Sequence, residues 1–201
     1  MAGTIALVYV NGYVPSWSAD LVADVSSAFA APVIPGEVTL DLAQAFAPER
    51  RQSHATLLLA ALIRQRPDNA SMIVGLTAVD LFIPVLTFVF GQAQLGGPGA
   101  VVSTYRLRNT FYGLPADDRL LRERARKEAV HELGHVHGLV HCPDYRCVMA
   151  ASTNIGEVDL KGPTFCTVCA DALRAGRARP LGTAGAAAPP ASARTPWDGV
   201  P

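Results

Sequence analysis

The chain has 201 residues, of which 50% are hydrophobic and 17% are charged. This composition supports a folded domain with a sizeable core and excludes disorder for most of the chain. Seventeen basic residues balance seventeen acidic ones at a sequence pI near 7.0, so neither nucleic acid nor a membrane surface is an expected partner.

Strand-like and helix-like segments alternate through the amino-terminal half. Residues 5–10 form a nearly unbroken apolar run, which predicts a strand covered on both faces. A first helix is predicted with Ser16 or Ser18 as its cap and Pro32 beyond its end. The further elements predicted before residue 110 are a strand at 38–42, a helix at 48–65 that opens at Pro48, and strands at 71–76, 86–91 and 100–107. This order indicates an α/β sheet with helices packed on it.

Two features bear on cellular location. The first residues lack a basic region and predict a strand instead of a signal peptide. Residues 72–90 are apolar enough to resemble a membrane span, but Asp80 and Pro84 interrupt them, so two buried strands are the better interpretation. We therefore expect a cytoplasmic protein.

A long helix is predicted after Pro115, where Asp117 and Asp118 favour a helix amino terminus. Basic residues are frequent along it. Three pairs place an acid and a base four residues apart: Asp118 with Arg122, Glu123 with Lys127, and Arg124 with Glu128. This spacing predicts a solvated, ion-paired helix face instead of an anion-binding site.

The same helix carries the motif H-E-x-x-H-x-x-G-x-x-H, in which His131, His135 and His141 are the histidines. Residues four apart on a helix differ by about 40° around its axis, so the first two histidines can hold one ion. Gly138 lets the chain turn and return the third histidine to that ion. Three imidazoles leave one position open on a tetrahedral zinc, as in a catalytic site. Glu132 lies beside the metal and is the candidate general base for a zinc-activated water.

Four cysteines follow the histidines in two closely spaced pairs. They are Cys142, Cys147, Cys166 and Cys169. A structural zinc, disulfides and buried thiols are all possible for such a set, and the spacing of the pairs fits a closed tetrahedral thiolate site. The lack of a signal peptide favours metal ligation over disulfides, which form in oxidising compartments.

The extended zinc motif with a methionine-containing turn is a signature of the metzincin peptidases. Here the motif continues directly into C-x4-C-x-M, ending at Met149, and a C-x-x-C follows. In this respect residues 4–174 resemble the archaemetzincin family. The resemblance implies a twisted five-stranded mixed sheet with one antiparallel edge strand, a long active-site helix and a small zinc-stapled C-terminal subdomain. It also implies a structural zinc at the cysteines, an edge strand at 87–91 that pairs with peptide substrate, and Met149 as an apolar floor beneath the metal ligands.

These observations predict a zinc-dependent metallopeptidase, either an aminopeptidase or an endopeptidase, that acts on a peptide or protein substrate as a monomer. The expected cofactors are two zinc ions, one catalytic and one structural. The alternative is a zinc-stabilised peptide-binding module with little hydrolytic activity. One catalytic domain is expected at residues 1–175, with a sheet and helix part to residue 138 and a Met149 and cysteine part at 139–175. The Ala-, Pro- and Gly-rich residues 176–201 predict a disordered tail.

Overall fold

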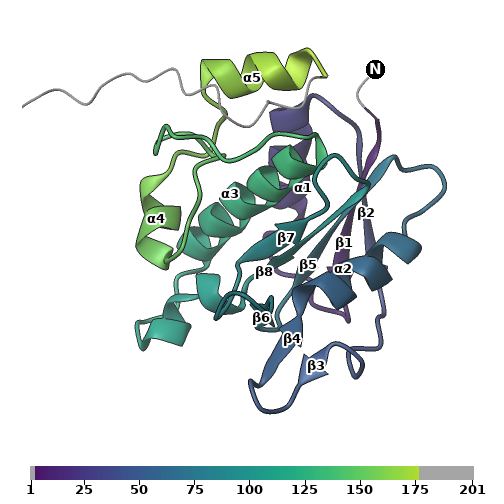
Figure 1. Ribbon diagram of the computed structural model, residues 1–201, viewed down its shortest axis with the longest axis vertical. Coiled ribbons are helices and arrows are strands. Elements are labelled where there is room, and N and C mark those ends of the chain that lie inside the picture. The colour runs from purple at the N-terminus through teal and green to yellow at the C-terminus, as the bar shows by residue number, and fades with distance from the viewer. Residues whose placement is uncertain (1–2, 177–201) are drawn as a thin grey trace, which may run out of the picture.

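The computed structural model describes residues 3–176, and a five-stranded mixed sheet lies at its centre. The strands are β1 (Ile5–Val10), β2 (Val33–Val38), β5 (Met72–Thr77), β7 (Gly91–Ala93) and β8 (Gly99–Ser103), in the order β2-β1-β5-β8-β7. The first four in this order run parallel, and β7 lies antiparallel to β8 at one edge (Figure 1). The predicted fold class is confirmed.

Helices cover both faces of the sheet. Alternate residues of β1 point to opposite faces. Ile5, Leu7 and Tyr9 pack with α1 (Ser18–Phe29) and α3 (Asp118–Val136), and Ala6, Val8 and Val10 pack with α2 (Ala55–Arg64). The long helix α3 therefore lies across one face of the sheet, as Figure 1 shows.

The remaining elements surround this framework. A small sheet is formed by β3 (Phe46–Ala47), β4 (Gln52–His54) and β6 (Leu81–Phe82). The 3-10 helices η1 (Tyr105–Leu107) and η2 (Asn109–Tyr112) lead from β8 to α3, and α4 (Ile155–Leu160) and α5 (Thr167–Arg174) follow α3. No helix within residues 3–176 is long and apolar enough to cross a membrane. The tail predicted at 176–201 lies outside the described residues, apart from Gly176.

Several predicted boundaries at the amino-terminal end of the fold are wrong. The residue that caps α1 is Trp17, which makes no side-chain capping bond, so neither Ser16 nor Ser18 caps this helix. The second strand is β2 and not 38–42. Pro35 lies within β2, where its missing N–H is tolerated because β2 is a sheet edge. The second helix begins at Ala55, because residues 48–54 instead form a turn and β4.

Two further strand boundaries differ near the site. Residues 86–89 lie outside the main sheet, and a bridge joins Val89 to Leu81 of β6. Phe90 accepts a hydrogen bond from the Ser103 N–H of β8, and the edge strand begins at Gly91. The fifth predicted strand ends as β8 at Ser103, and η1 follows. The predicted antiparallel edge is therefore present, but it lies later in the chain and is shorter.

The prediction of a solvated charged face on α3 is wrong for its central residues. Arg124, Lys127 and Glu128 are 5%, 3% and 3% exposed. Helix α4 folds back against α3, so that Arg124 makes two 2.6 Å contacts to the Asp159 carboxylate and Lys127 donates to two α4 carbonyls. Of the three predicted pairs, Glu123 with Lys127 is an ion pair. Arg124 has Asp159 as its acidic partner instead of Glu128.

Candidate active site

The last two turns of α3 carry His131, Glu132 and His135, and the chain turns directly after them. Gly138 has φ +84°, a left-handed conformation that only glycine adopts without strain. This turn ends the helix and brings His141 back toward the two helical histidines. The sequence motif thus becomes one cluster because a single glycine reverses the chain.

The three histidines converge on one point. A ring nitrogen from each of His131, His135 and His141 lies within 4.8 Å of the others, and the Nε2 atoms of the first two are 3.1 Å apart. His131 donates from Nδ1 to the Val148 carbonyl at 2.8 Å, and His135 donates from Nδ1 to the Leu139 carbonyl at 2.7 Å. These bonds place the proton on Nδ1, so each Nε2 presents a lone pair to the shared point.

Burial favours the neutral form of these imidazoles. It lowers the pKa of His131 well below the ordinary value, and the positive charge of Lys161 lowers it further. Burial also lowers the pKa values of His135 and His141. All three rings are therefore uncharged at neutral pH, which is the state that binds a metal cation.

Glu132 is 6% exposed and lies against the edge strand. Burial raises the pKa of its carboxyl group well above the ordinary value, the nearby Glu128 raises it further, and Lys161 acts in the opposite direction. A Cβ atom on Gly91 would lie 2.6 Å from Glu132 Oε1. The absence of a side chain at the first residue of β7 therefore makes room for the candidate base.

The segment after α3 packs back against this helix. Met149 is fully buried, and a Cβ atom on Gly134 would lie 2.4 Å from its sulfur. The carbonyl of Met149 accepts a 2.9 Å hydrogen bond from the N–H of Cys142. Met149 thus packs tightly against α3 through Gly134, as an apolar floor would.

The four cysteines form a second cluster. Their sulfur atoms lie within 4.8 Å of one another, with 3.8 Å between those of Cys142 and Cys166, and none of the four is in a disulfide. Burial raises the pKa of Cys147 to about 11 and also raises that of Cys169. Without a cation, the Cys147 and Cys169 thiols keep their protons at neutral pH. A bound divalent metal would stabilise the thiolates instead.

An open cleft of about 320 Å³ runs past the histidine cluster. One side is formed by the segment that leads into β7 and the other by the residues after Met149. Its lining residues are Leu86, Thr87, Phe88, Val89, Phe90, Gly91, Glu128, His131, Glu132, His141, Ala151, Ser152 and Thr153. The segment 87–91, predicted to contact substrate, therefore does line this cleft.

The cleft segment is anchored from behind. Arg50 donates to the carbonyls of Leu86 and Thr87 at 3.1 and 2.9 Å, and Gln52 donates to the Thr87 carbonyl at 3.1 Å. Arg106 lies over the Phe88 ring at 4.3 Å and forms a double contact with the Asp80 carboxylate. These long-range contacts hold one wall of the cleft in place, and no sequence motif predicts them.

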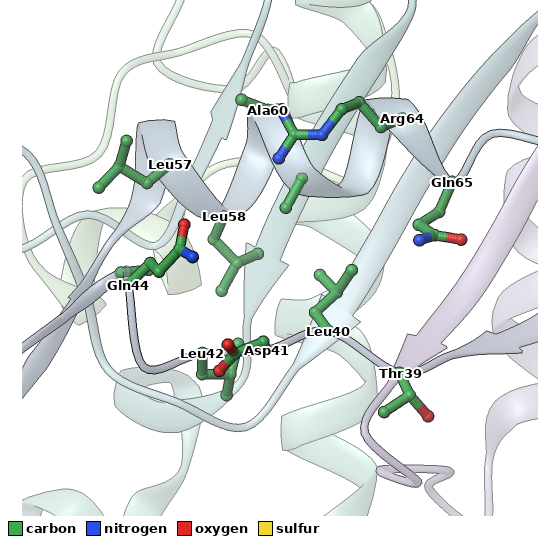
Figure 2. A pocket seen from close by; sticks show the side chains of 12 residues that line it. Thr39, Leu40, Asp41, Leu42, Gln44, Leu57, Leu58, Ala60, Arg64 and Gln65 are labelled. Atoms are coloured by element: carbon green, nitrogen blue, oxygen red, sulfur yellow. The ribbon is translucent and has the colours of Figure 1, made fainter.

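A second cavity, of about 360 Å³, lies between residues 39–45 and α2. Figure 2 shows Leu58 projecting from α2 into this space, above Leu40 and Leu42. Neither histidines nor cysteines line it. It is therefore separate from the histidine and cysteine clusters.

Sequence reasoning missed several residues of the site. Gly91, Gly134 and Lys161 were not singled out, and Glu128 was assigned to a solvated face. Gly134 had a usable signal, because glycine inside a helix costs about 1 kcal/mol relative to alanine and so indicates a packing need. The positions of Gly91, Glu128 and Lys161 in the site depend on contacts from distant segments, which no local pattern predicts.

Comparisons with known proteins agree with this geometry. The model of peptidase family M54 matches residues 38–175. The archaemetzincin of Methanocaldococcus jannaschii is 46% identical over 125 residues, covering 62% of this chain and 68% of that protein. The archaemetzincin of Thermococcus kodakarensis is 40% identical over 172 residues, covering 82% and 92%.

Solved structures give the same result. The crystal structure of the Methanopyrus kandleri archaemetzincin matches with a TM-score of 0.77 and 38% identity, covering 86% of this chain and 94% of that one. A zinc-dependent peptidase from Methanocorpusculum labreanum matches with a TM-score of 0.76 and 32% identity, covering 84% and 99%. These matches favour a peptidase over a binding module. The chain belongs to peptidase family M54, the archaemetzincins.

Proposed function

We propose that this zinc metallopeptidase holds its catalytic zinc on His131, His135 and His141 and uses Glu132 as the general base. The observation that carries this assignment is the convergence of the three imidazoles beside a buried carboxylate, in the wall of an open cleft. The donor set suits zinc, because neutral imidazoles are among its preferred ligands and three of them leave a position for substrate.

The chain's own groups have distinct duties in peptide hydrolysis. A zinc ion held by His131, His135 and His141 would supply Lewis-acid chemistry for this reaction. Glu132 accepts the proton that the attacking water loses, then delivers it to the departing amine. Its raised pKa suits both steps, since the carboxylate is a stronger base than an exposed one. Main-chain groups of residues 87–91 would align an extended peptide.

A second zinc, in this proposal, is held by the four cysteines and is structural. Four thiolates close a tetrahedral site and leave no position for substrate. The cluster begins at Cys142, one peptide bond after His141, and includes Cys147, two residues before Met149. Zinc there would fix the loop that presents the third histidine, without taking part in the reaction. The cytoplasmic location, the monomeric state and the two-part division at residue 138 stay predictions of the sequence.

The test is cleavage of a complex peptide library by zinc-replete protein, read by mass spectrometry. Glu132→Ala should abolish cleavage while two zinc ions per chain stay bound. Arg119→Ala, at an exposed position on the same helix, is the control and should cleave normally. Full cleavage by the Glu132→Ala protein would refute the assigned base, and a zinc content of one per chain would refute one of the two metal sites.

A further inference from the structure

Glu128 has no role in the chemistry proposed above, yet it lines the cleft one helical turn before Glu132. Its side chain is only 4% exposed and lies beside the 1% exposed Lys161, whose Nζ is 2.8 Å from Glu128 Oε1. Lys161 also donates to the Ala150 carbonyl at 3.4 Å. A buried ion pair therefore forms part of the cleft wall, next to the residue that follows Met149.

This ion pair leaves hydrogen-bonding capacity unused. The 2.8 Å contact lacks hydrogen-bond geometry, since Glu128 Oε1 is buried without a hydrogen-bond partner. Leaving a buried carboxylate without donors is costly, so native proteins almost always supply them. Glu128 thus places an ion-paired carboxylate in the cleft wall whose Oε1 atom makes no hydrogen bond.

A second polar group in the same cleft is also unpartnered. The Ser152 hydroxyl oxygen is buried and makes no hydrogen bond within the described part of the chain. Ser152 belongs to the segment after Met149. The cleft therefore offers one strong acceptor, at Glu128, and one hydroxyl that can donate or accept.

We propose that Glu128, positioned by Lys161, and Ser152 select a substrate residue that flanks the scissile bond and carries a carboxamide side chain, Asn or Gln. This inference rests on the proposed peptidase function of the same cleft. A carboxamide donates through its NH₂ group to Glu128 and accepts through its oxygen from Ser152, so it satisfies both groups.

Other side-chain classes match this lining less well. An acidic side chain brings a second negative charge toward Glu128. A Lys or Arg side chain brings a second positive charge toward Lys161, which already neutralises Glu128. An apolar side chain displaces water from the carboxylate without replacing its hydrogen bonds. The ion pair thus favours substrate side chains that are uncharged and donate a hydrogen bond.

The test compares cleavage-site preferences in a peptide library between the wild type and the double variant Glu128→Met/Lys161→Met. Replacing a buried ion pair by apolar residues of similar volume is often neutral for stability, which keeps the fold intact. The wild type should prefer Asn and Gln over Leu by about tenfold at one position flanking the cut, and the double variant should lose this preference. Ser152→Ala should reduce the preference severalfold.

A matched control removes an ion pair outside the cleft. The double variant Arg122→Met/Asp24→Asn breaks a 3.0 Å pair between α3 and α1, and it should keep the wild-type preference. If only water donates a hydrogen bond to the Glu128 carboxylate, the wild type should cleave equally at Asn, Gln and Leu. That result would overturn the inference. An unchanged preference in the Glu128→Met/Lys161→Met protein would overturn it as well.

Peptide binding separates this inference from the proposed function. In the Glu132→Ala background, fluorescence anisotropy should show about tenfold tighter binding of Gln-containing peptides than of their Leu counterparts. If the wild type cleaves nothing but this difference persists, the peptidase proposal fails and the selectivity stands. Equal affinities would reject the selectivity, whatever the enzyme cleaves.

Discussion

Gly91→Ala is the substitution that most directly tests the position of Glu132. The added Cβ atom would lie 2.6 Å from Glu132 Oε1, 2.7 Å from its Cγ and 2.8 Å from the Val101 carbonyl oxygen. One obstacle is a side chain that can move, but the other is backbone of the neighbouring strand β8. Strand β7 and Glu132 must therefore both shift.

The size of this overlap sets the expected losses of stability and of activity. Forcing a methyl group into a packed site costs about 1–3 kcal/mol, which corresponds to a fall of about 2–12 °C in Tm for a domain of this size. Displacing a catalytic group by about 1 Å lowers the rate by about 100-fold. We therefore expect kcat/KM of the Gly91→Ala protein to fall by about 100-fold, with zinc still bound.

Gly36→Ala is the matched control, because Gly36 lies in β2 at the opposite edge of the same sheet. A Cβ atom there would be 3.5 Å from a Val8 methyl group, an ordinary contact. This variant should keep wild-type activity and stability. Steady-state kinetics, thermal unfolding and zinc analysis of both proteins decide the matter. Wild-type kcat/KM for Gly91→Ala would show that Glu132 does not need the space above β7.

Two further predictions concern stability. Arg124→Met removes the double contact to the half-exposed Asp159 carboxylate and the hydrogen bonds to the Leu107 carbonyl and Asn109 Oδ1, and it should lower the free energy of unfolding by about 1–3 kcal/mol. Arg119→Met, at an exposed position, should change it by less than about 0.5 kcal/mol, and equal urea midpoints for the two variants would refute a stabilising role of the Arg124 contacts. In metal-free protein, burial raises the pKa of Cys147 from 9.0 to about 11, so the unfolded chain loses its thiol proton first and stability should fall as the pH rises from about 9 to 11. Bound zinc should abolish this pH dependence, because thiolates that ligate zinc carry no proton between pH 9 and 11. Urea unfolding at pH 9 and at pH 11, with and without zinc, measures it.

The histidine and cysteine clusters are adjacent in sequence and are also joined by contacts between distant residues. Lys161 follows α4 and contacts both Glu128 of α3 and the Ala150 carbonyl beside Met149. The N–H of Cys166 donates to the Cys147 sulfur at 3.3 Å, so the segment that carries Lys161 is itself tied to the cysteine cluster. Through these contacts, the proposed structural zinc would support one wall of the cleft as well as the third histidine.

The sequence by itself determined the parts of the site that depend on local geometry. His131 and His135 are one helical turn apart, and the turn at Gly138 spans only a few residues, so their convergence follows from backbone geometry alone. The same holds for β1, β5 and α3, whose apolar runs or helical spacing predicted the element type that the structure has. Asp117 also caps α3 by accepting from the Leu120 N–H, near the acidic helix start predicted there.

Only the tertiary structure decided which charged residues are buried and where the sheet edges lie. The pattern of α3 predicted a solvated face for Arg124 and Glu128, but α4 and Lys161 cover that face from more than thirty residues later in the chain. β2 contains Pro35 and Gly36, which disfavour a strand except at an edge, and its edge position is a property of the whole sheet. Gly91 matters because Glu132 approaches it from another element. Such contacts join residues far apart in sequence, so no local pattern encodes them, and they determine how the cleft is shaped around the metal ligands.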